Sequence, residues 1–282
     1  MSRTGILAGL IGRGIQASLT PALHEHEGDA QALRYLYRLI DADQLGLDDS
    51  ALPQLLDAAQ NTGFTGLNIT FPFKQAILPL LDELSDEARG IGAVNTVVLR
   101  DGKRVGHNTD CLGFAEGFRR GLPGVNKGLV VQLGAGGAGS AVAHALLAEG
   151  VQTLVLFEVD AARGQALVEN LAARFGPGRA VLGSDLAAVL GDADGLVNTT
   201  PVGMAKLPGM PLPEGLLHAR LWVAEIIYFP LQTELLRQAR ALGCRTLDGG
   251  TMAVFQAVKA FELFSGRPAD AERMQAHFAR LV

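Results

Sequence analysis

One stretch decides the fold of this chain of 282 residues: Gly128-Leu129-Val130-Val131-Gln132-Leu133-Gly134-Ala135-Gly136-Gly137-Ala138-Gly139. Its apolar part is typical of a strand buried on both faces, and a helix-forming run follows the glycines. In the spacing G-x-G-x-x-G, the first glycine permits a tight turn and the second lets a pyrophosphate approach the backbone. The third lets the helix pack against the strand. The segment predicts a Rossmann-type dinucleotide site, with cofactor contacts from Gly134, Ala135, Gly136, Gly137, Ala138 and Gly139.

The choice of cofactor depends on the acid that ends the next apolar run, residues 153–157. Glu158 lies 19 residues after Gly139, close to the spacing of about 20 that places an acid on the ribose. Its carboxylate would accept a hydrogen bond from the ribose 2′-OH and repel a 2′-phosphate. Asp160 is a rival for the ribose contact, and Arg163 is the nearby cation that would soften the preference. We predict NAD in preference to NADP.

Composition excludes several classes of protein. Hydrophobic residues make up 48% and charged residues 19% of the chain, which is typical of a compact globular protein. The net charge is −5 without a basic block, so we do not expect nucleic acid as a partner. The longest apolar runs are too short to span a bilayer, so we do not expect a membrane as a partner. Cys111 and Cys244 lie far apart, and we expect a reduced, cytoplasmic protein without a signal peptide. We expect no metal site, and a monomer or a homodimer.

Strand-like and helical patterns alternate along the chain, which indicates an α/β fold with parallel sheets. The expected strands are residues 6–11, 35–40, 66–69, 95–99, 104–106, 129–133, 153–157, 180–182, 195–197, 222–226 and 245–247. The expected helices include residues 21–26, 52–61, 75–84, 252–264 and 270–281. Asp101-Gly102 predicts a tight hairpin turn between two of the strands.

The order of these patterns predicts three parts. Residues 1–110 form an α/β substrate-binding and catalytic domain, and residues 111–248 form the dinucleotide-binding domain, with a cleft between them. Residues 249–282 form C-terminal helices whose apolar stripe packs back on the substrate domain. Residues 201–213, rich in Pro and Gly, predict a surface loop near the cofactor.

Polar residues stand in the first domain where strands end. They are Ser18 and Thr20, Asn68 and Thr70, Lys74, Asn95, and Asn108-Thr109-Asp110. Each has a structural explanation: Thr20 is placed to cap a helix with Pro21 behind it, Asn108 or Thr109 to cap another, and Lys74 to face solvent. Together, a Lys and an Asp at strand-to-helix junctions beside a hydroxyl-rich pocket predict a proton-transfer pair.

The motifs along the chain resemble those of the shikimate dehydrogenase family. They are S-x-[ST]-P-x-x-H at residues 18–24, G-x-N-[VI]-T-x-P-x-K at 66–74, I-G-A-V-N-T at 91–96, G-x-N-T-D-x-x-G at 106–113, the glycine-rich turn, N-[AT]-[ST]-P-x-G-M at 198–204, Y-x-P-x-x-T at 228–233 and G-x-x-M-x-x-x-Q-A at 249–257. The resemblance covers nearly the whole chain, and the motifs stand in the family's order.

The resemblance implies roles for individual residues. Lys74 and Asp110 match the catalytic pair. Substrate-binding positions are matched by Ser18, Thr20, Thr70, Asn95, Tyr228 and Gln256. Positions near the cofactor are matched by Thr199, Pro201, Met204 and Gly250. The implied reaction is reversible hydride transfer between shikimate and 3-dehydroshikimate, with the proton moved by the Lys–Asp pair. The pattern leaves open which member of the pair holds the proton.

Six residues at four places in the chain depart from the biosynthetic members of the family. This chain has Thr20, Glu25 and His107 where those enzymes usually have serine, asparagine and tyrosine. It has Glu158-Val159-Asp160 where they have an Asn-Arg-Thr whose arginine holds the NADP phosphate. These departures resemble the NAD-dependent quinate/shikimate dehydrogenase group. Quinate or aminoshikimate therefore stays open as the substrate, and the non-enzyme alternative is a homologue that senses nucleotide and substrate without turnover.

Overall fold

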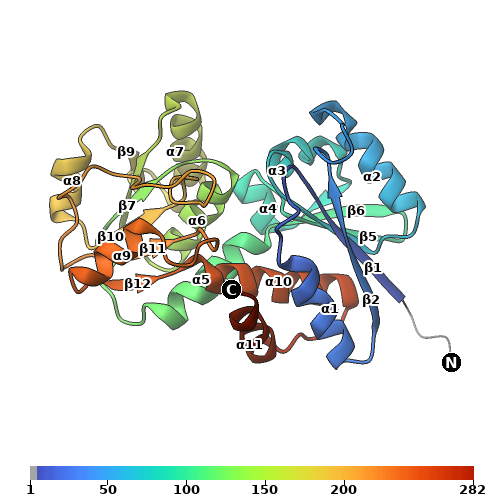
Figure 1. Ribbon diagram of the computed structural model, residues 1–282. Helices are drawn as coiled ribbons and strands as arrows, with labels where there is room; N and C mark the ends of the chain where they lie inside the picture. The colour runs from blue at the N-terminus through green and yellow to red at the C-terminus, as the bar shows by residue number, and fades with distance from the viewer. Residues whose placement is uncertain (1–4) are drawn as a thin grey trace. The chain divides into compact units, whose positions relative to one another are not determined.

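The computed structural model describes residues 5–282, which divide into two compact units (Figure 1). One unit runs up to Thr109 and resumes at Val254–Val282, and the other is Asp110–Ala253. The chain therefore passes from one unit to the other at the start of α5 (Thr109–Gly121) and inside α10 (Gly249–Ser265).

The first unit contains a six-stranded mixed sheet in the order β2-β1-β3-β5-β6-β4. Its strands are β1 (Gly5–Gly12), β2 (Arg34–Asp41), β3 (Gly66–Ile69), β4 (Glu83–Leu84), β5 (Thr96–Arg100) and β6 (Lys103–His107). β1 pairs in parallel with β2 and β3, whereas β5 is antiparallel to β3 and β6. The predicted hairpin is confirmed, because Asp101 and Gly102 have φ values of 53° and 77° in a two-residue turn.

The helices of this unit differ from expectation at residues 75–84 and at α4 (Asp86–Ile91), which was not expected. They are α1 (Thr20–Ala30), α2 (Leu52–Asn61), α3 (Phe73–Ala76), α4, α11 (Ala271–Leu281) and the 3-10 turns Asp49–Ala51 and Leu78–Leu80. The prediction of one helix over residues 75–84 is wrong, since α3 ends at Ala76 and β4 begins at Glu83. Pro79 lacks an N–H group and disfavours a helical residue before it, so the α-helix stops early.

The C-terminal half of α10 completes the core of the first unit. Phe261 and Phe264 belong to one hydrophobic cluster with Ile6 and Tyr35, and the Tyr35 and Phe261 rings stack at 5.1 Å. A Cβ on Gly66 would lie 2.1 Å from the Phe264 ring, so only glycine lets this helix approach β3. The last segment of the chain is thus part of the first sheet's core.

The second unit contains an all-parallel sheet in the order β12-β11-β10-β7-β8-β9. Its strands are β7 (Leu129–Leu133), β8 (Thr153–Phe157), β9 (Ala180–Leu182), β10 (Gly195–Asn198), β11 (Trp222–Glu225) and β12 (Arg245–Leu247). This is the doubly wound order of a dinucleotide-binding fold, in which the strand order reverses between β7 and β10. Ligands bind at that reversal, outside the carboxyl ends of the strands.

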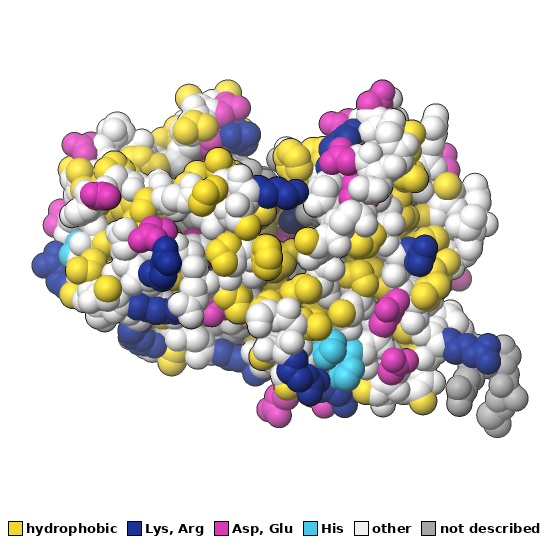
Figure 2. Space-filling model, in the orientation of Figure 1, with side chains coloured by type: hydrophobic (Ala, Val, Ile, Leu, Met, Phe, Trp, Pro, Cys, Tyr) yellow, Lys and Arg dark blue, Asp and Glu magenta, His cyan; other side chains and the backbone are white. Residues whose placement is uncertain are grey.

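Helices enclose the second sheet. They are α5, α6 (Gly137–Ala148), α7 (Ala161–Phe175), α8 (Leu186–Asp192) and α9 (Glu234–Ala241). α6 is buried at every position from Gly139 to Leu147, so the helix after the glycine turn is a central core element. Among the described helices none has the length and apolarity needed to cross a membrane. On the face shown in Figure 2, basic and acidic side chains are interspersed.

Candidate active site

The glycine turn between β7 and α6 has no room for larger residues at two of its glycines. Gly134 has a φ of +94°, and a Cβ on Gly139 would lie 2.7 Å from the Gly134 carbonyl oxygen. That Cβ would also lie 2.8 Å from Oγ1 of Thr199, which donates to the Leu133 and Gly134 carbonyls at 2.7 and 2.9 Å. Thr199 therefore joins the end of β10 to the turn.

Gly136 is different, because nothing lies within 4 Å of a Cβ placed on it. It is the N-cap residue of α6 and provides no side-chain cap. Backbone N–H groups in the first turn of a helix have no partner within the helix. Open space beside a helix N-terminus fits the pyrophosphate of a dinucleotide, because the exposed N–H groups and the helix dipole attract phosphate. The turn thus has the form that NAD or NADP requires.

A buried glutamine, which the sequence analysis gives no role, supports the turn. The Gln132 side chain is fully buried and its Nε2 donates to the carbonyls of Gly134 and Gly139, both at 2.9 Å. It therefore ties the first and last glycines of the turn to β7. A polar residue among apolar ones, in a strand expected to be buried on both faces, is the sequence feature that could have revealed this role.

Glu158 follows β8 and is bonded to the same turn. Its carboxylate accepts from the Ala135 N–H at 2.7 Å, the Asp160 N–H at 3.0 Å and the Arg163 guanidinium at 2.7 Å. Burial opposes ionisation, but these partners lower the pKa of Glu158 to about 2. The carboxylate is therefore ionised at neutral pH. Asp160 accepts from the Arg163 N–H at 3.1 Å and caps α7.

The other predicted cofactor residues follow β10 and β12. Thr199 is buried and Pro201 exposed, while Met204 is 41% exposed in a loop that forms only an isolated bridge with Leu207. The surface loop predicted for residues 201–213 thus has no helix or longer strand. Gly250, in the first turn of α10, donates its N–H to the Asp248 carboxylate at 3.0 Å.

Tyr228 lies in the loop after β11. Partial burial, and then the charge of the Asp110 carboxylate in the same unit, raise the pKa of the Tyr228 phenol. The phenol therefore stays protonated at neutral pH and can donate a hydrogen bond. Asp110 itself is buried in the first turn of α5.

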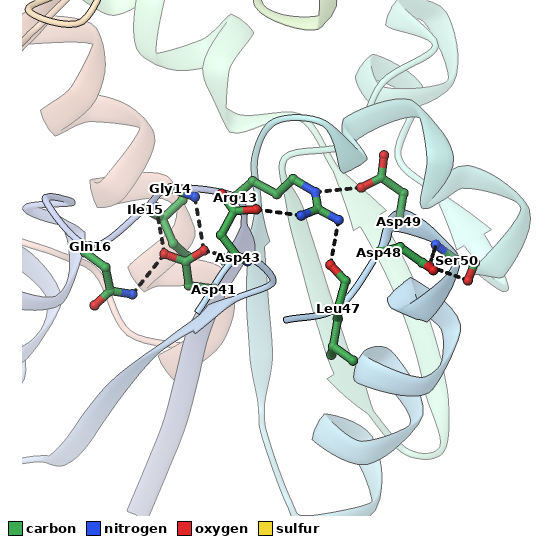
Figure 3. Close-up of polar contacts among 10 residues, drawn as sticks. All are labelled: Arg13, Gly14, Ile15, Gln16, Asp41, Asp43, Leu47, Asp48, Asp49 and Ser50. Atoms are coloured by element: carbon green, nitrogen blue, oxygen red, sulfur yellow. Dashed lines mark hydrogen bonds and ion pairs between the residues drawn. The ribbon is translucent and has the colours of Figure 1, made fainter. Parts of the chain in front are cut away.

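In the first unit, buried Asp41 at the end of β2 shapes the loop after β1 (Figure 3). Its carboxylate accepts from the N–H groups of Gly14 and Ile15, both at 3.0 Å, and from Gln16 Nε2 at 2.9 Å. Burial raises the pKa of Asp41, but these hydrogen bonds outweigh it and lower the pKa. Arg13 fixes the other side of the loop, as its guanidinium binds Asp43, Asp49 and the Leu47 carbonyl (Figure 3).

This loop leads to Ser18 and Thr20, for which one expectation is corrected. Leu19, not Thr20, is the N-cap residue of α1, and no side chain caps the helix there. Ser18 Oγ instead donates to Thr20 Oγ1 at 3.1 Å and accepts from the Thr20 N–H at 3.3 Å. The two hydroxyls lie together and are half-buried. With Thr20 inside the helix, the capping explanation for its hydroxyl is removed.

A buried hydrogen-bond network surrounds Asn95. Asn95 Oδ1 accepts from the Thr109 N–H at 2.7 Å, and Asn95 Nδ2 donates to Thr109 Oγ1 at 2.9 Å. Thr96 and Asn68 continue the network, with Asn68 Nδ2 donating to Thr96 Oγ1 at 2.9 Å. The Thr109 side chain, which the sequence offers together with Asn108 as a helix cap, is fully buried against Asn95. The position of Thr109 beside Asp110 in the motif is the sequence feature that could have revealed its place in the network.

Backbone hydrogen bonds hold Thr70 and Lys74 in the same unit as this network. The Thr70 N–H donates to the Ile11 carbonyl at 3.0 Å, and the Lys74 carbonyl accepts from the Val94 N–H at 2.8 Å. Val94 precedes Asn95, so this bond joins the Lys74 backbone to the segment that carries the network, and Asp110 follows Thr109 in the chain. Gln256 is half-buried on α10. Among the described residues, no group of three or more His, Cys, Asp or Glu is placed to hold a metal ion.

Known proteins resemble the chain over its whole length. Residues 10–97 match the family model for the shikimate dehydrogenase substrate binding domain. The shikimate dehydrogenase (NADP(+)) of Streptomyces avermitilis is 56% identical over 284 residues, which cover 100% of this chain and 98% of the relative. The quinate/shikimate dehydrogenase (NAD(+)) of Corynebacterium efficiens is 50% identical over 285 residues, which cover 100% of both proteins.

Solved structures agree with the fold. Quinate dehydrogenase from Corynebacterium glutamicum in complex with NAD superimposes with a TM-score of 0.92 at 48% identity. The match covers 98% of this chain and 99% of that structure. The predicted α/β fold, with a substrate domain and a Rossmann-type domain, is confirmed. The chain belongs to the shikimate dehydrogenase family of NAD(P)-dependent oxidoreductases.

Proposed function

We propose that this chain is an NAD-dependent dehydrogenase that interconverts shikimate and 3-dehydroshikimate. The first unit, which includes the matched residues 10–97, would bind the hydroxy acid, and the second unit the cofactor. The observation that carries the proposal is the open space at Gly136 beside the start of α6, which would admit a pyrophosphate. The buried hydrogen-bond network around Asn95 supports it, since polar groups there would orient ring hydroxyls.

Glu158 supports the preference for NAD. Its ionised carboxylate is hydrogen-bonded to Ala135 within the glycine turn, so it would meet the adenosine ribose as a fixed negative charge. A ribose 2′-OH can donate to that charge, whereas a 2′-phosphate is repelled. Arg163 already pairs with Glu158 at 2.7 Å, which reduces its ability to bind a phosphate.

Lys74 and Asp110 are proposed as the proton-transfer pair. In the oxidation, NAD supplies the nicotinamide that accepts a hydride from the carbinol carbon. The hydroxyl proton passes to the Lys74–Asp110 pair as the carbonyl forms, and the reverse transfer accompanies reduction. Ser18 and Thr20 would hold the carboxylate, and Thr70, Asn95, Tyr228 and Gln256 the rest of the ring.

Quinate is the second candidate substrate. The relatives named for quinate are about half identical to this chain, and Thr20 departs from the serine of the biosynthetic enzymes. Quinate carries a hydroxyl on the carbon that bears the carboxylate. The extra methyl group of Thr20, beside the proposed carboxylate site, therefore affects the choice between shikimate and quinate. A difference of one methyl group is worth about 1–3 kcal/mol, which shifts a ratio of substrates and does not exclude one.

The test is a matrix of kcat/KM values for shikimate, quinate and aminoshikimate, each with NAD and with NADP. The proposal expects turnover of shikimate with NAD as the better cofactor, and quinate oxidised at a comparable or lower rate. NADP ahead of NAD would refute the cofactor assignment. Binding of NADH and shikimate without turnover would instead favour the sensing homologue.

A further inference from the structure

Glu225, the last residue of β11, has a buried carboxylate that the proposed chemistry does not use. It is 1% exposed and lies opposite Asn198, the last residue of β10, in the parallel sheet. Asn198 Nδ2 donates to both carboxylate oxygens, at 3.1 and 3.0 Å. The ends of the two strands are therefore joined through one carboxylate.

On the β10 side, Asn198 shapes the loop that carries Thr199, Pro201 and Met204. Its Nδ2 also donates to the Val202 carbonyl at 3.0 Å. Its Oδ1 accepts from the N–H and the hydroxyl of Thr200, at 3.0 and 2.7 Å. A shift of the Glu225 carboxylate would therefore move the amide that orders this loop.

On the β11 side, the same carboxylate holds both ends of the loop that carries Tyr228. It accepts from the N–H groups of Ile226 and Ile227 at 3.0 and 3.2 Å, and from Thr233 Oγ1 at 3.2 Å. Thr233 caps α9 through the Leu236 N–H. The Ile226 and Ile227 carbonyls lie so close to Gly249 that a Cβ there would be 2.3 and 2.5 Å away.

We infer that Glu225 is a positioning residue of the dehydrogenase: its carboxylate fixes the loop after β10 and the loop after β11 relative to each other. The inference rests on the proposed function: the first loop carries Thr199, Pro201 and Met204, which match positions near the cofactor, and the second carries Tyr228, which is proposed to hold the substrate. A misplacement of about 1 Å at such a site costs on the order of 100-fold in rate, so a shared anchor for the two loops affects turnover directly.

A carboxylate is an expensive choice for a purely structural anchor. Burial raises the pKa of Glu225 to about 7, although Asn198, Thr233 and two backbone N–H groups lower it. The fold therefore loses stability as the pH rises from the ordinary carboxyl pKa to about 7, while the ionised carboxylate accepts from more donors than an amide can. The neutral substitution Glu225→Gln keeps the shape, removes that cost and places an NH₂ group among donors.

The experiment compares the full-length parent, Glu225→Gln and the control Glu234→Gln. Glu234 begins α9, beside Thr233, and its side chain bonds Arg237 and Gln238 on the surface. Three quantities are measured at about pH 8, where Glu225 is ionised. These are kcat with NAD, the fluorescence of bound NADH, which reports how the nicotinamide is held, and Tm.

We expect Glu225→Gln to lower kcat about tenfold and to bring the fluorescence of bound NADH closer to that of free NADH, with Tm equal to or above that of the parent. Glu234→Gln should match the parent. Kinetics and fluorescence at control values would overturn the inference. So would a lower Tm alongside the lost activity, because the carboxylate would then be structural. A parent without turnover refutes the proposed function, and the fluorescence comparison still decides the role of Glu225.

Discussion

A single side chain, Glu158, has two roles, one in hydrogen bonds within the protein and one toward the cofactor. It accepts hydrogen bonds inside the protein from Ala135 and Arg163, and it also presents a negative charge to whatever binds beside the glycine turn. Its removal frees Arg163 to attract a 2′-phosphate. One substitution therefore changes repulsion into attraction at the same position.

We expect Glu158→Ala to shift the ratio of kcat/KM for NAD to that for NADP by about tenfold or more toward NADP, which is about 1.4 kcal/mol. Steady-state kinetics with both cofactors measures the ratio. Glu169→Ala on α7, whose carboxylate bonds Gln165 on the exposed surface, is the matched control and should leave the ratio unchanged. An unchanged ratio in Glu158→Ala would mean that other groups select the cofactor.

Lys74 is expected to matter in the transition state more than in substrate binding. Lys74→Ala should lower kcat by about 10²–10⁴, the usual worth of general acid–base catalysis, while KM for the hydroxy acid changes by a smaller factor. Lys259→Ala, which removes an exposed lysine paired with Glu262, serves as the control. A variant that keeps kcat and raises only KM would make Lys74 a binding residue.

Single residues were predictable from sequence where a motif fixes their spacing. The position of Glu158 just after β8 was predicted in this way, because the distance from the glycine turn to the end of the second strand is set by the fold. Asp41 and Glu225 were not, because their hydrogen-bond donors come from loops that only the sheet brings together. A lone acid at a strand end does not reveal such partners.

Among the elements, the turn between β7 and α6 has one glycine that is needed for packing, Gly139, and one that leaves space for a ligand, Gly136. A Cβ on Gly136 meets nothing within 4 Å, whereas one on Gly139 meets the Gly134 carbonyl at 2.7 Å. Gly136→Ala should therefore keep the parent Tm and bind NADH at least about tenfold more weakly. Gly139→Ala should also lose about 1–3 kcal/mol of stability, because the helix must move.

Thermal unfolding and titration with NADH distinguish these two variants. Each serves as the other's control, since both add the same methyl group to the same turn. Equal losses of stability would show that Gly136 is also required for packing. Full NADH affinity in Gly136→Ala would show that the open space beside it is not the pyrophosphate site.

α1 and α11 are joined by the fully buried carboxylate of Glu27, which binds Arg273 through both oxygens at 2.7 Å. Burial opposes ionisation, yet Arg273, the Asp270 N–H and Gln31 lower the pKa of Glu27 overall. The stability that this ion pair contributes is therefore present above the ordinary carboxyl pKa and is lost as the pH falls through the lowered one.

We expect Glu27→Gln to lower the free energy of unfolding by about 2 kcal/mol at neutral pH, below the usual cost of a broken buried pair because Arg273 is partly exposed. Urea unfolding of parent and variant measures the difference, which should shrink as the pH falls below the ordinary carboxyl pKa. Glu272→Gln, on the exposed side of α11, is the control. A difference independent of pH would rule out the ion pair as its source.

Elements were predictable where turn chemistry or a long apolar run decides them. Asp101-Gly102 determined the hairpin, and the run at residues 129–133 gave β7 with the observed bounds. Residues 75–84 were misassigned because their apolar spacing fits a helix, while Pro79 and the pairing of β4 with β6 break it. The pairing is a tertiary contact that local pattern does not contain.

At the scale of the whole molecule, the two units differ in how their chain is assembled. The second unit is continuous, Asp110–Ala253, and has its own core around Phe114, Leu146 and Trp222. A fragment of residues 110–253 should therefore fold alone and bind NADH. A fragment of residues 1–109 lacks Phe261 and Phe264 and should stay unfolded unless residues 254–282 are supplied.

Circular dichroism of the separately expressed fragments measures their folding, and titration with NADH measures binding by the fragment of residues 110–253. Residues 254–282 with Phe261 and Phe264 both changed to Ala provide the control, which should fail to restore folding. A folded 1–109 fragment would mean that its sheet needs no help from α10. An unfolded 110–253 fragment would mean that the continuous unit depends on the rest of the chain.

The place of Phe264 against Gly66 has a consequence for the protein as it leaves the ribosome. A contiguous domain usually folds as it is made. Here β1 to β3 are made first, but their apolar face is covered only when the C-terminal half of α10 has been made. The later-made half can be complete while the earlier-made half is still open. The part of the nascent chain that is made first thus needs protection from aggregation until residues 254–282 are made, and removal of those residues would leave its apolar face exposed.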